Sequence, residues 1–386
     1  MNMQIVLLLC CLCIQMVSGF AAITNNANAN KKTVALPDTY RALVAESTGT
    51  SFSEVATVRT FPTPTSLGKG EALIRVEYAG INGGCETFRA RGEFAFSGNS
   101  DADEQNPFHL GAEGVGIVAS IGDGVTDVAV GDAVCFVGSA FSEYSVCKAS
   151  TLWKVSQATP EYVGLRISGL TACAMLERTG RVREGETVLV TAAAGGAGHF
   201  AVQFAKLAGC RVIGTCGSER KAKVLRDLGC DHVINYKEED VAAEVERLAP
   251  KGLDAVLEGV GGDMLQIALD NLAPKGRLLQ IGYISEYPHN PEAKLESTKN
   301  ELDASDLFWN SKTISRGEQT IYGNAWPKDY GAVASCKDRV LGLYEEGKLK
   351  SLVDDTEQFV GLESVSDAIN HMLSGKTIGK VVVRIP

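Results

Sequence analysis

Residues 187–218 read TVLVTAAAGGAGHFAVQFAKLAGCRVIGTCGS, which indicates a strand, a glycine-rich turn, a helix and a second strand. Thr187–Thr191 is a short run rich in β-branched side chains, as expected of a parallel strand that is buried on both faces. Small residues then follow in the order A-x-G-x-x-G, formed by Ala193, Gly195 and Gly198. This order is the dinucleotide-binding fingerprint with alanine at its first position.

The residues beyond the fingerprint predict a helix over about Ala197–Leu207 and a second strand over Arg211–Thr215. The missing side chains allow the backbone to approach a pyrophosphate, and the helix N-terminus aims free N–H groups and its positive dipole end at it. An ordinary βαβ turn with small residues for packing is the alternative. We expect the phosphates to be bound by Ala193, Gly195, Gly196, Ala197 and Gly198.

The end of the second predicted strand selects the cofactor. A site that prefers NAD usually places an acidic residue there, about 20 residues past the glycines, to hold the ribose 2′-hydroxyl. This chain has Cys216 instead, followed by Ser218, Arg220 and Lys221, and a 2′-phosphate needs such hydroxyl and cationic partners. We therefore predict NADPH, held by Ser218 and Lys221. The cations could instead solvate the next helix, and Tyr236 fits either the adenosine end or plain packing.

Composition limits the class of protein. At 386 residues the chain is too long for one compact core, which predicts two domains. Its 45% hydrophobic and 22% charged residues are those of an ordinary globular protein. The formal net charge of −10 argues against nucleic-acid binding, because a phosphate backbone requires a basic surface.

Two patterns of secondary structure follow one another along the chain. Residues 40–157 contain short predicted strands separated by Gly, Pro and Asp turns, which is typical of a β-barrel-like domain. Residues 158–317 alternate between predicted helices and strands, which indicates a doubly wound parallel sheet with helices on both faces. We expect an α/β fold, with residues 318–386 returning to the first domain.

The N-terminus resembles a targeting leader. The first 30 residues carry no charge, Ile5–Val17 is nearly all apolar, and Val17-Ser18-Gly19 resembles a small-residue cleavage site. We predict a signal peptide over residues 1–19 and a transit or linker segment over 20–39. This arrangement is similar to the bipartite leaders of algae with secondary plastids, which predicts a chloroplast enzyme; plain secretion is the alternative. We expect no membrane anchoring of the mature chain.

Cysteine usage favours a reducing compartment. Of the 11 cysteines, three lie in the predicted leader, and the other eight are scattered without a C-x-x-C pair. A secreted disulfide scaffold is small and dense in cysteine, which this chain is not. We expect most of these thiols to be reduced and buried.

Six motifs are spread along the chain: AGINGGCETFRARGEF (79–94), HLGAEGVGIVASIGDGV (109–125), VTAAAGGAGHFAVQFAK (190–206), LDAVLEGVGGDM (253–264), KGRLLQIGYIS (275–285) and TIGKVVVRI (377–385). Together they resemble the medium-chain dehydrogenase/reductase superfamily over about Tyr40–Pro386. Within it the chain is similar to the zeta-crystallin-like quinone oxidoreductases, and most of all to the prostaglandin reductase 3 group. The resemblance implies a Rossmann domain beside a GroES-like barrel, and a homodimer.

The zinc ligands of related alcohol dehydrogenases are missing at the matching positions. The first ligand, a Cys in a G-x-C turn, corresponds to Asn82, and the His of G-H-E corresponds to Ala112. Only Glu113 remains, whereas catalytic zinc needs three protein ligands. We therefore expect no metal.

Chemistry without a Lewis acid favours an already activated double bond. In a conjugated enone or a quinone, hydride adds to one carbon and the developing negative charge spreads onto an oxygen, which fixed hydrogen-bond donors can stabilise. The protein then chiefly positions cofactor and substrate. The sequence predicts an NADPH-dependent enone reductase; a quinone reductase, and a crystallin-like protein that binds NADPH without turnover, are the alternatives.

The resemblance also implies roles for particular residues. Asn82 is expected near the nicotinamide and its ribose, although a residue that only satisfies its own turn is the alternative. Thr171 is expected at the nicotinamide, or as a helix hydroxyl bonded to the preceding turn. Many relatives carry a Tyr a few residues after the Asn, where this chain has Thr87-Phe88. The proton donor is therefore Tyr283, a water or the cofactor ribose. The same cleft should be lined by Val260, Gly261, Gly282 and Tyr283.

Overall fold

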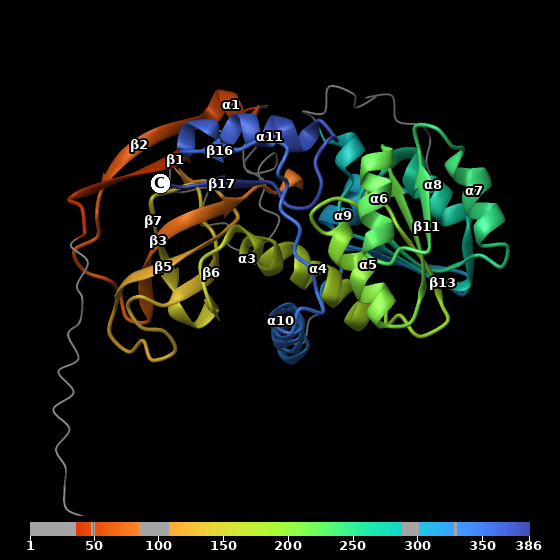
Figure 1. Ribbon diagram of the computed structural model, residues 1–386, viewed down its shortest axis with the longest axis horizontal. Helices are drawn as coiled ribbons and strands as arrows, with labels where there is room; N and C mark the ends of the chain where they lie inside the picture. Colours follow the sequence, from red (N-terminus) through yellow and green to blue (C-terminus); the bar gives the residue numbers. More distant parts are fainter. Residues whose placement is uncertain (1–35, 48, 50, 85–107, 288–300, 328–329) are drawn as a thin grey trace, which may run out of the picture. The chain divides into compact units, whose positions relative to one another are not determined.

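The computed structural model describes residues 36–47, 49, 51–84, 108–287, 301–327 and 330–386 (Figure 1). The predicted signal peptide, most of the predicted 20–39 segment and Thr87-Phe88 lie outside these residues. Within the described residues, no helix combines the length and the apolar character needed to cross a bilayer.

The glycine-rich stretch lies in a seven-stranded sheet, in which all pairs are parallel except the β14–β15 pair at one edge. The apolar, β-branched runs of the strands in this sheet are buried, as expected of strands covered on both faces. In spatial order the strands are β11 (His232–Asn235), β10 (Arg211–Cys216), β9 (Thr187–Val190), β12 (Leu253–Glu258), β13 (Leu272–Gln280), β15 (Gln319–Gly323) and β14 (Thr313–Arg316).

The strand order reverses between β9 and β12. The chain builds β9, β10 and β11 toward one edge and then returns to place β12 on the other side of β9. In open α/β sheets, ligands bind at such a switch point, outside the carboxyl ends of the strands. The connecting helices are α5 (Gly198–Leu207), α6 (Glu219–Asp227), α7 (Val241–Leu248) and α8 (Gly262–Asp270). The predicted doubly wound sheet is confirmed.

The β-rich part of the chain forms two further sheets. One has the order β2-β1-β4, and the other has the order β16-β17-β3-β5-β6-β8 with β7 also paired to β3. The strands are β1 (Thr39–Ala45), β2 (Ala56–Pro62), β3 (Glu71–Gly80), β4 (Phe108–His109), β5 (Glu113–Ile121), β6 (Ala133–Val137), β7 (Tyr144–Lys148), β8 (Trp153–Val155), β16 (Phe359–Val360) and β17 (Val382–Arg384).

The C-terminal elements pack with these β-rich sheets, although they follow the parallel sheet in sequence. Strand β17 pairs antiparallel with β3, and α11 (Val365–Leu373) contributes to the same core. Figure 1 shows β16, β17 and α11, coloured blue, beside the strands from the N-terminal part of the chain. This return is what brings Lys380, near the C-terminus, to Asn82 and Glu113 at the site below. The remaining helices are α1 (Phe52–Val55), α3 (Pro160–Gly164), α4 (Leu170–Cys173), α9 (Ala304–Trp309) and α10 (Tyr330–Glu345).

A helical segment links the two kinds of sheet. The sequence predicts a helix over Arg166–Glu177, and the structure has a longer run, Pro160–Thr179, in which α3 and α4 are separated and followed by wider π turns. Such π turns often occur at functional sites. This run carries Thr171 and packs against Phe200 and Phe204 of α5 in one buried cluster.

Candidate cofactor site and active site

The glycine-rich turn follows β9 at the switch point and has no room for larger side chains. A Cβ on Gly198 would lie 2.4 Å from the carbonyl oxygen of Ala192, so only glycine fits there. Alanine is accommodated at the first fingerprint position because Gly214 faces it from β10: a Cβ on Gly214 would lie 3.0 Å from the Cβ of Ala193. The departure from the usual first glycine is therefore compensated by the neighbouring strand.

Helix α5 begins directly at this turn, at Gly198. Among the described residues, no side chain caps its first turn, although His199 N already donates to the carbonyl oxygen of Gly195 over 3.1 Å. Gly195 and Gly196 present bare backbone beside this first turn, and a Cβ on Gly196 would lie 3.3 Å from Ser168 Oγ. This arrangement fits a pyrophosphate. The structure brings together Ala193, Gly195, Gly196, Ala197 and Gly198, as predicted.

A second group of predicted residues lies where β10 ends. Ser218 caps α6, its Oγ accepting a hydrogen bond from Lys221 N over 3.4 Å. The Tyr236 hydroxyl lies against Gly217, since a Cβ on Gly217 would be only 2.5 Å from the Tyr236 hydroxyl oxygen. The Tyr236 residue is 44% exposed. A hydroxyl, a cation and an aromatic ring therefore gather at one strand end.

Lys221 has the charge that a phosphate requires. Its Nζ donates to the carbonyl oxygen of Gly375 over 2.7 Å, and desolvation by burial lowers its pKa. The carbonyl oxygen is neutral, so this contact leaves the ammonium charge of Lys221 uncompensated, whereas a carboxylate would neutralise it. The neighbouring Arg220 pairs with Asp355 on the surface, so the two cations of the predicted set differ in their surroundings.

The register of three strands assembles the other end of the site. Gly80 at the end of β3 pairs with Glu113 on β5 and with Val382 on β17. Asn82 lies two residues beyond Gly80, and Lys380 lies two residues before Val382. Antiparallel pairing therefore brings Asn82 and Lys380 beside Glu113, although they are 298 residues apart in sequence.

These three side chains form a buried hydrogen-bonded cluster. Lys380 Nζ lies 2.6 Å from Glu113 Oε1 and donates to Asn82 Oδ1 over 2.8 Å. Asn82 Nδ2 donates to Glu113 Oε1 over 2.9 Å, and the second carboxylate oxygen accepts from Ile167 N over 2.8 Å. The side chains of Lys380 and Glu113 are 2% and 0% exposed. A buried ion pair is tolerated when further hydrogen bonds support it, and Asn82 and Ile167 N supply such bonds here.

The donor set at these positions does not fit zinc. Asn82 supplies an amide, Ala112 a methyl group, and the Glu113 carboxylate is already occupied by an ammonium. The part of the chain that the structure describes contains no group of three or more His, Cys, Asp or Glu side chains arranged for a metal. A divalent cation would be repelled by the Lys380 charge and would lack the ligands that zinc requires.

Glu258 is a buried residue of the site that sequence reasoning missed. It ends β12, is 0% exposed, and its Oε1 accepts from Val260 N over 2.7 Å and Gly261 N over 3.0 Å. Thr191 Oγ1 donates to the same oxygen over 3.3 Å, which ties the ends of β9 and β12 together. Burial raises the pKa of Glu258 to about 7. The sequence places Glu258 beside the predicted Val260–Gly261 turn, but nothing in the sequence marks its burial.

The turn after β12 packs on the segment after β13. Gly261 has φ +77°, and a Cβ there would lie 2.9 Å from Tyr283 Cβ. Gly282 is close to Tyr287: a Cβ on Gly282 would lie 3.1 Å from the Tyr287 hydroxyl oxygen. The structure thus brings Gly261 beside Tyr283, and it places Thr171 as a buried residue of α4. That Val260, Gly261, Gly282, Tyr283 and Thr171 line the nicotinamide site stays a prediction.

The hydroxyl of Tyr283 faces helix α9. It accepts hydrogen bonds from Trp309 Nε1 over 2.7 Å and from Ser305 Oγ over 3.4 Å, and the residue is 4% exposed. Its ring also packs edge-on against Phe308 at a centroid distance of 5.5 Å. These contacts describe a packed aromatic residue, so its role as proton donor stays a prediction that this geometry disfavours.

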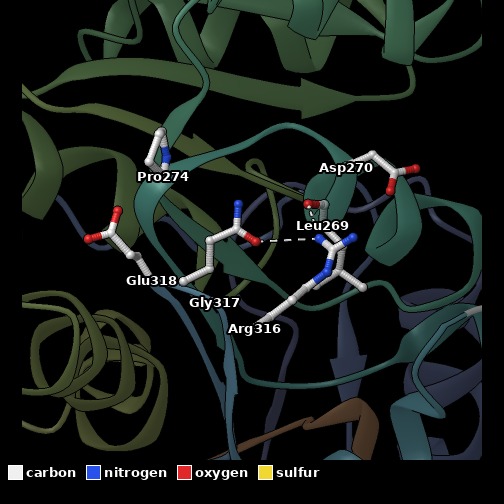
Figure 2. A pocket seen from close by; sticks show the side chains of 7 residues that line it. Leu269, Asp270, Pro274, Arg316, Gly317 and Glu318 are labelled. Atoms are coloured by element: carbon white, nitrogen blue, oxygen red, sulfur yellow. Dashed lines mark hydrogen bonds between the residues drawn. The ribbon is translucent and has the colours of Figure 1, made fainter.

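A hollow of about 520 Å³ lies elsewhere, beside the β14–β15 hairpin (Figure 2). The Arg316 guanidinium lies along it and donates to the carbonyl oxygen of Leu269 over 2.9 Å. The hollow is at the amino end of β13, whereas the phosphate-binding turn follows the carboxyl end of β9. It is therefore separate from the candidate site. Its lining residues are Leu269, Asp270, Pro274, Arg316, Gly317, Glu318 and Gln319.

Comparisons with known proteins agree with this geometry. The zinc-binding dehydrogenase family matches residues 196–335, and the alcohol dehydrogenase GroES-like domain matches residues 68–227. Prostaglandin reductase-3 of Mus musculus is 39% identical over 360 residues, 91% of each chain. A probable quinone oxidoreductase of Leishmania amazonensis is 35% identical over 351 residues, 90% of this chain and 99% of that one.

A solved structure shares the fold and was determined with a cofactor. It is a mycobacterial protein complexed with NADPH, 27% identical, with a TM-score of 0.71 over 89% of this chain and 99% of that one. The match spans both the parallel sheet and the β-rich sheets. Together with the sequence relatives, these findings show that the chain belongs to the medium-chain dehydrogenase/reductase superfamily, with a GroES-like domain.

Proposed function

We propose that the protein is an NADPH-dependent reductase of α,β-unsaturated ketones, such as lipid-derived carbonyls or oxylipins that resemble 15-oxo-prostaglandins. One observation carries the proposal: a phosphate-binding turn at the switch point is combined with an Asn82–Glu113–Lys380 cluster at the other end of the site. The names of the relatives, a prostaglandin reductase and a probable quinone oxidoreductase, support the same class of reaction.

The described residues fit NADPH at each of its charged groups. The bare turn at Gly195–Gly198 and the uncapped start of α5 hold the pyrophosphate. Ser218 and Lys221 hold the 2′-phosphate, because a hydroxyl and a cation stand where an NAD site has an acid. Tyr236 covers the adenosine end. The structure solved with NADPH in a relative supports this choice of cofactor.

When bound, NADPH supplies a hydride, which a conjugated enone accepts at its β-carbon. The chain's own contribution is positioning and electrostatic stabilisation. Asn82 orients the reacting end through its amide, which Glu113 and Lys380 hold in place. Val260, Gly261 and Gly282 bound the site beside the switch point. The proton reaches the α-carbon from a water, the ribose hydroxyl or Tyr283.

We propose further that the reaction uses no zinc. The support is the chemistry of the donors: an amide, a methyl group and a carboxylate paired with an ammonium. Elemental analysis of active protein tests this directly. Substoichiometric zinc together with activity that survives a chelator is the expected result, and stoichiometric zinc would overturn the proposal.

Quinone reduction is the second candidate, favoured by the Leishmania amazonensis relative. NADPH oxidation with methyl vinyl ketone and with benzoquinone, followed by product analysis, separates the candidates. A saturated ketone supports enone reduction, and a hydroquinone or semiquinone supports the alternative. Saturable NADPH binding without oxidation of cofactor by either compound would instead indicate a crystallin-like binding protein.

The assembly and the compartment are also proposals. We propose a homodimer, which size-exclusion chromatography with light scattering tests. We propose that residues 1–39 direct the chain through the secretory route to a chloroplast; the seven described cysteines are free thiols, which is compatible with a reducing stroma. A fluorescent protein fused behind residue 39 reports the compartment, and secretion would contradict it.

A further inference from the structure

We propose that Lys380 is a positioning residue, which fixes the side-chain amide of Asn82 in one of its two orientations. The inference deepens the proposed function, on which it rests, because Asn82 is there assigned to the reacting end of the cofactor. It assigns a task to the lysine of the TIGKVVVRI motif, which sequence reasoning left without one.

The two neighbours of Asn82 leave its amide no choice of orientation. An ammonium group can only donate hydrogen bonds, so the amide oxygen must face Lys380 Nζ. An ionised carboxylate can only accept, so the amide nitrogen must face Glu113. A flipped amide would place NH₂ against NH₃⁺ and oxygen against oxygen, and both contacts would be repulsive. Each amide group keeps further hydrogen-bonding capacity, and its direction is set by Lys380.

The stem of Lys380 follows a narrow path that fixes where its charge ends. A Cβ on Gly80 would lie 2.9 Å from Lys380 Cε, and a Cβ on Gly196 would lie 3.7 Å from Lys380 Cδ. The stem is thus confined between the end of β3 and the glycine-rich turn. Such confinement lets a flexible side chain hold its ammonium at one point.

The backbone beside Lys380 is tied to the phosphate-binding turn. Gly379 N donates to the carbonyl oxygen of Ala194 over 2.8 Å, and Gly379 bridges to Gly195. Gly379 has φ +77°, and a Cβ there would lie 2.3 Å from the Leu352 carbonyl oxygen, so the chain requires glycine at this point. One residue pair, Gly379-Lys380, therefore contacts the turn with its backbone and Asn82 with its charge.

This geometry predicts that Lys380 acts through Asn82. Without the ammonium, the amide oxygen of Asn82 loses its charged donor and Glu113 alone orients the amide. The Lys380→Met and Asn82→Ala substitutions should therefore remove the same interaction. A double-mutant cycle measures this coupling. Loss of one hydrogen bond of this kind corresponds to about a tenfold effect.

The experiment uses the full chain and the variants K380M, N82A and K380M/N82A. NADPH dissociation constants come from cofactor fluorescence, and kcat comes from NADPH oxidation with methyl vinyl ketone. Each single variant is expected to lose about tenfold in kcat or in NADPH affinity, and the double variant no more than either alone. Losses that multiply to about a hundredfold would overturn the inference.

Folding is controlled by two further variants. K380M leaves the Glu113 carboxylate buried without its counter-charge, so K380M/E113Q, which removes both charges, is measured beside it. K380M/E113Q should fold and still lose about tenfold in kcat or in NADPH affinity. Wild-type kinetics in this variant would overturn the inference. The matched control is R277M, which breaks the mostly buried Arg277–Glu186 pair (2.7 Å) between β13 and the residue before β9, away from the site. R277M should lose stability and keep kcat and NADPH affinity.

The outcome separates the inference from the function. If the wild-type protein oxidises NADPH with neither an enone nor a quinone, the proposed function fails. The NADPH dissociation constants then still complete the cycle. Non-additive losses in affinity support Lys380 as the residue that positions Asn82, and additive losses contradict it.

Discussion

Glu258 makes the stability of the protein depend on pH in a way that one substitution isolates. Its carboxyl group is fully buried at the end of β12 and accepts hydrogen bonds from Val260 N, Gly261 N and Thr191 Oγ1. Glu258→Gln keeps the shape and one acceptor oxygen but cannot ionise. The difference between the wild-type chain and E258Q therefore reports the titration of this one group.

The magnitude follows from the shift in pKa. Burial raises the pKa of Glu258 from 4.5 to about 7, so the folded state holds a proton that the unfolded chain has released. The stabilising contribution is complete below pH 4.5 and is lost as the pH rises through about 7. At about 1.4 kcal/mol for each pH unit, the wild-type protein loses about 3 kcal/mol relative to E258Q across this window.

Urea unfolding of both proteins between pH 4.5 and 8.5 measures the effect. The difference in free energy of unfolding between E258Q and the wild type should grow as the pH rises and become constant above the folded pKa. Because all other titrating groups are shared, they cancel in the difference. Parallel pH profiles for the two proteins would refute the claim that Glu258 is protonated when buried.

Three further substitutions test the cofactor site and the proton donor. Lys221→Ala should weaken NADPH by at least about tenfold and NADH by less than about twofold, as measured by fluorescence titration, since a charged hydrogen bond to phosphate is lost; equal losses would refute the 2′-phosphate role. Gly198→Ala should abolish binding of both cofactors, because its Cβ would lie 2.4 Å from the Ala192 carbonyl oxygen; retained affinity in isothermal titration would contradict the required close approach. Tyr283→Phe should keep kcat within about twofold and lower the free energy of unfolding by about 1 kcal/mol, because it loses the hydrogen bond from Trp309; a fall in kcat of about a hundredfold or more would restore Tyr283 as the proton donor.

Local patterns in the sequence were sufficient for the parallel sheet and its phosphate-binding turn. The strand predicted over Arg211–Thr215 is β10 (Arg211–Cys216), and α5 begins within one residue of its predicted start. Both features depend on neighbouring residues, since β-branched runs, glycines and helix periodicity act over a few positions. Helix α9 shows the limit, because its six residues are too few for a periodic signal. Its one clear mark is Asp303, which caps the first turn.

The nicotinamide end of the site was only partly predictable. Asn82 was identified by resemblance, but its partners were not, because the register of β17 on β3 brings Lys380 to it from 298 residues away. No local pattern encodes such a pairing. Glu258 was missed for a related reason: an acid at a strand end gives no sign, in sequence alone, that it will be buried and accept two backbone N–H groups.

The central claim is that this chain uses NADPH, without a metal, to reduce a double bond that is conjugated to a carbonyl group. The most direct measurement is NADPH oxidation by purified protein of known metal content, with methyl vinyl ketone as substrate and the product identified by mass spectrometry. Zinc-free protein should yield the saturated ketone, with NADPH preferred over NADH. Activity that appears only with stoichiometric zinc, or an alcohol product that retains the double bond, would contradict it.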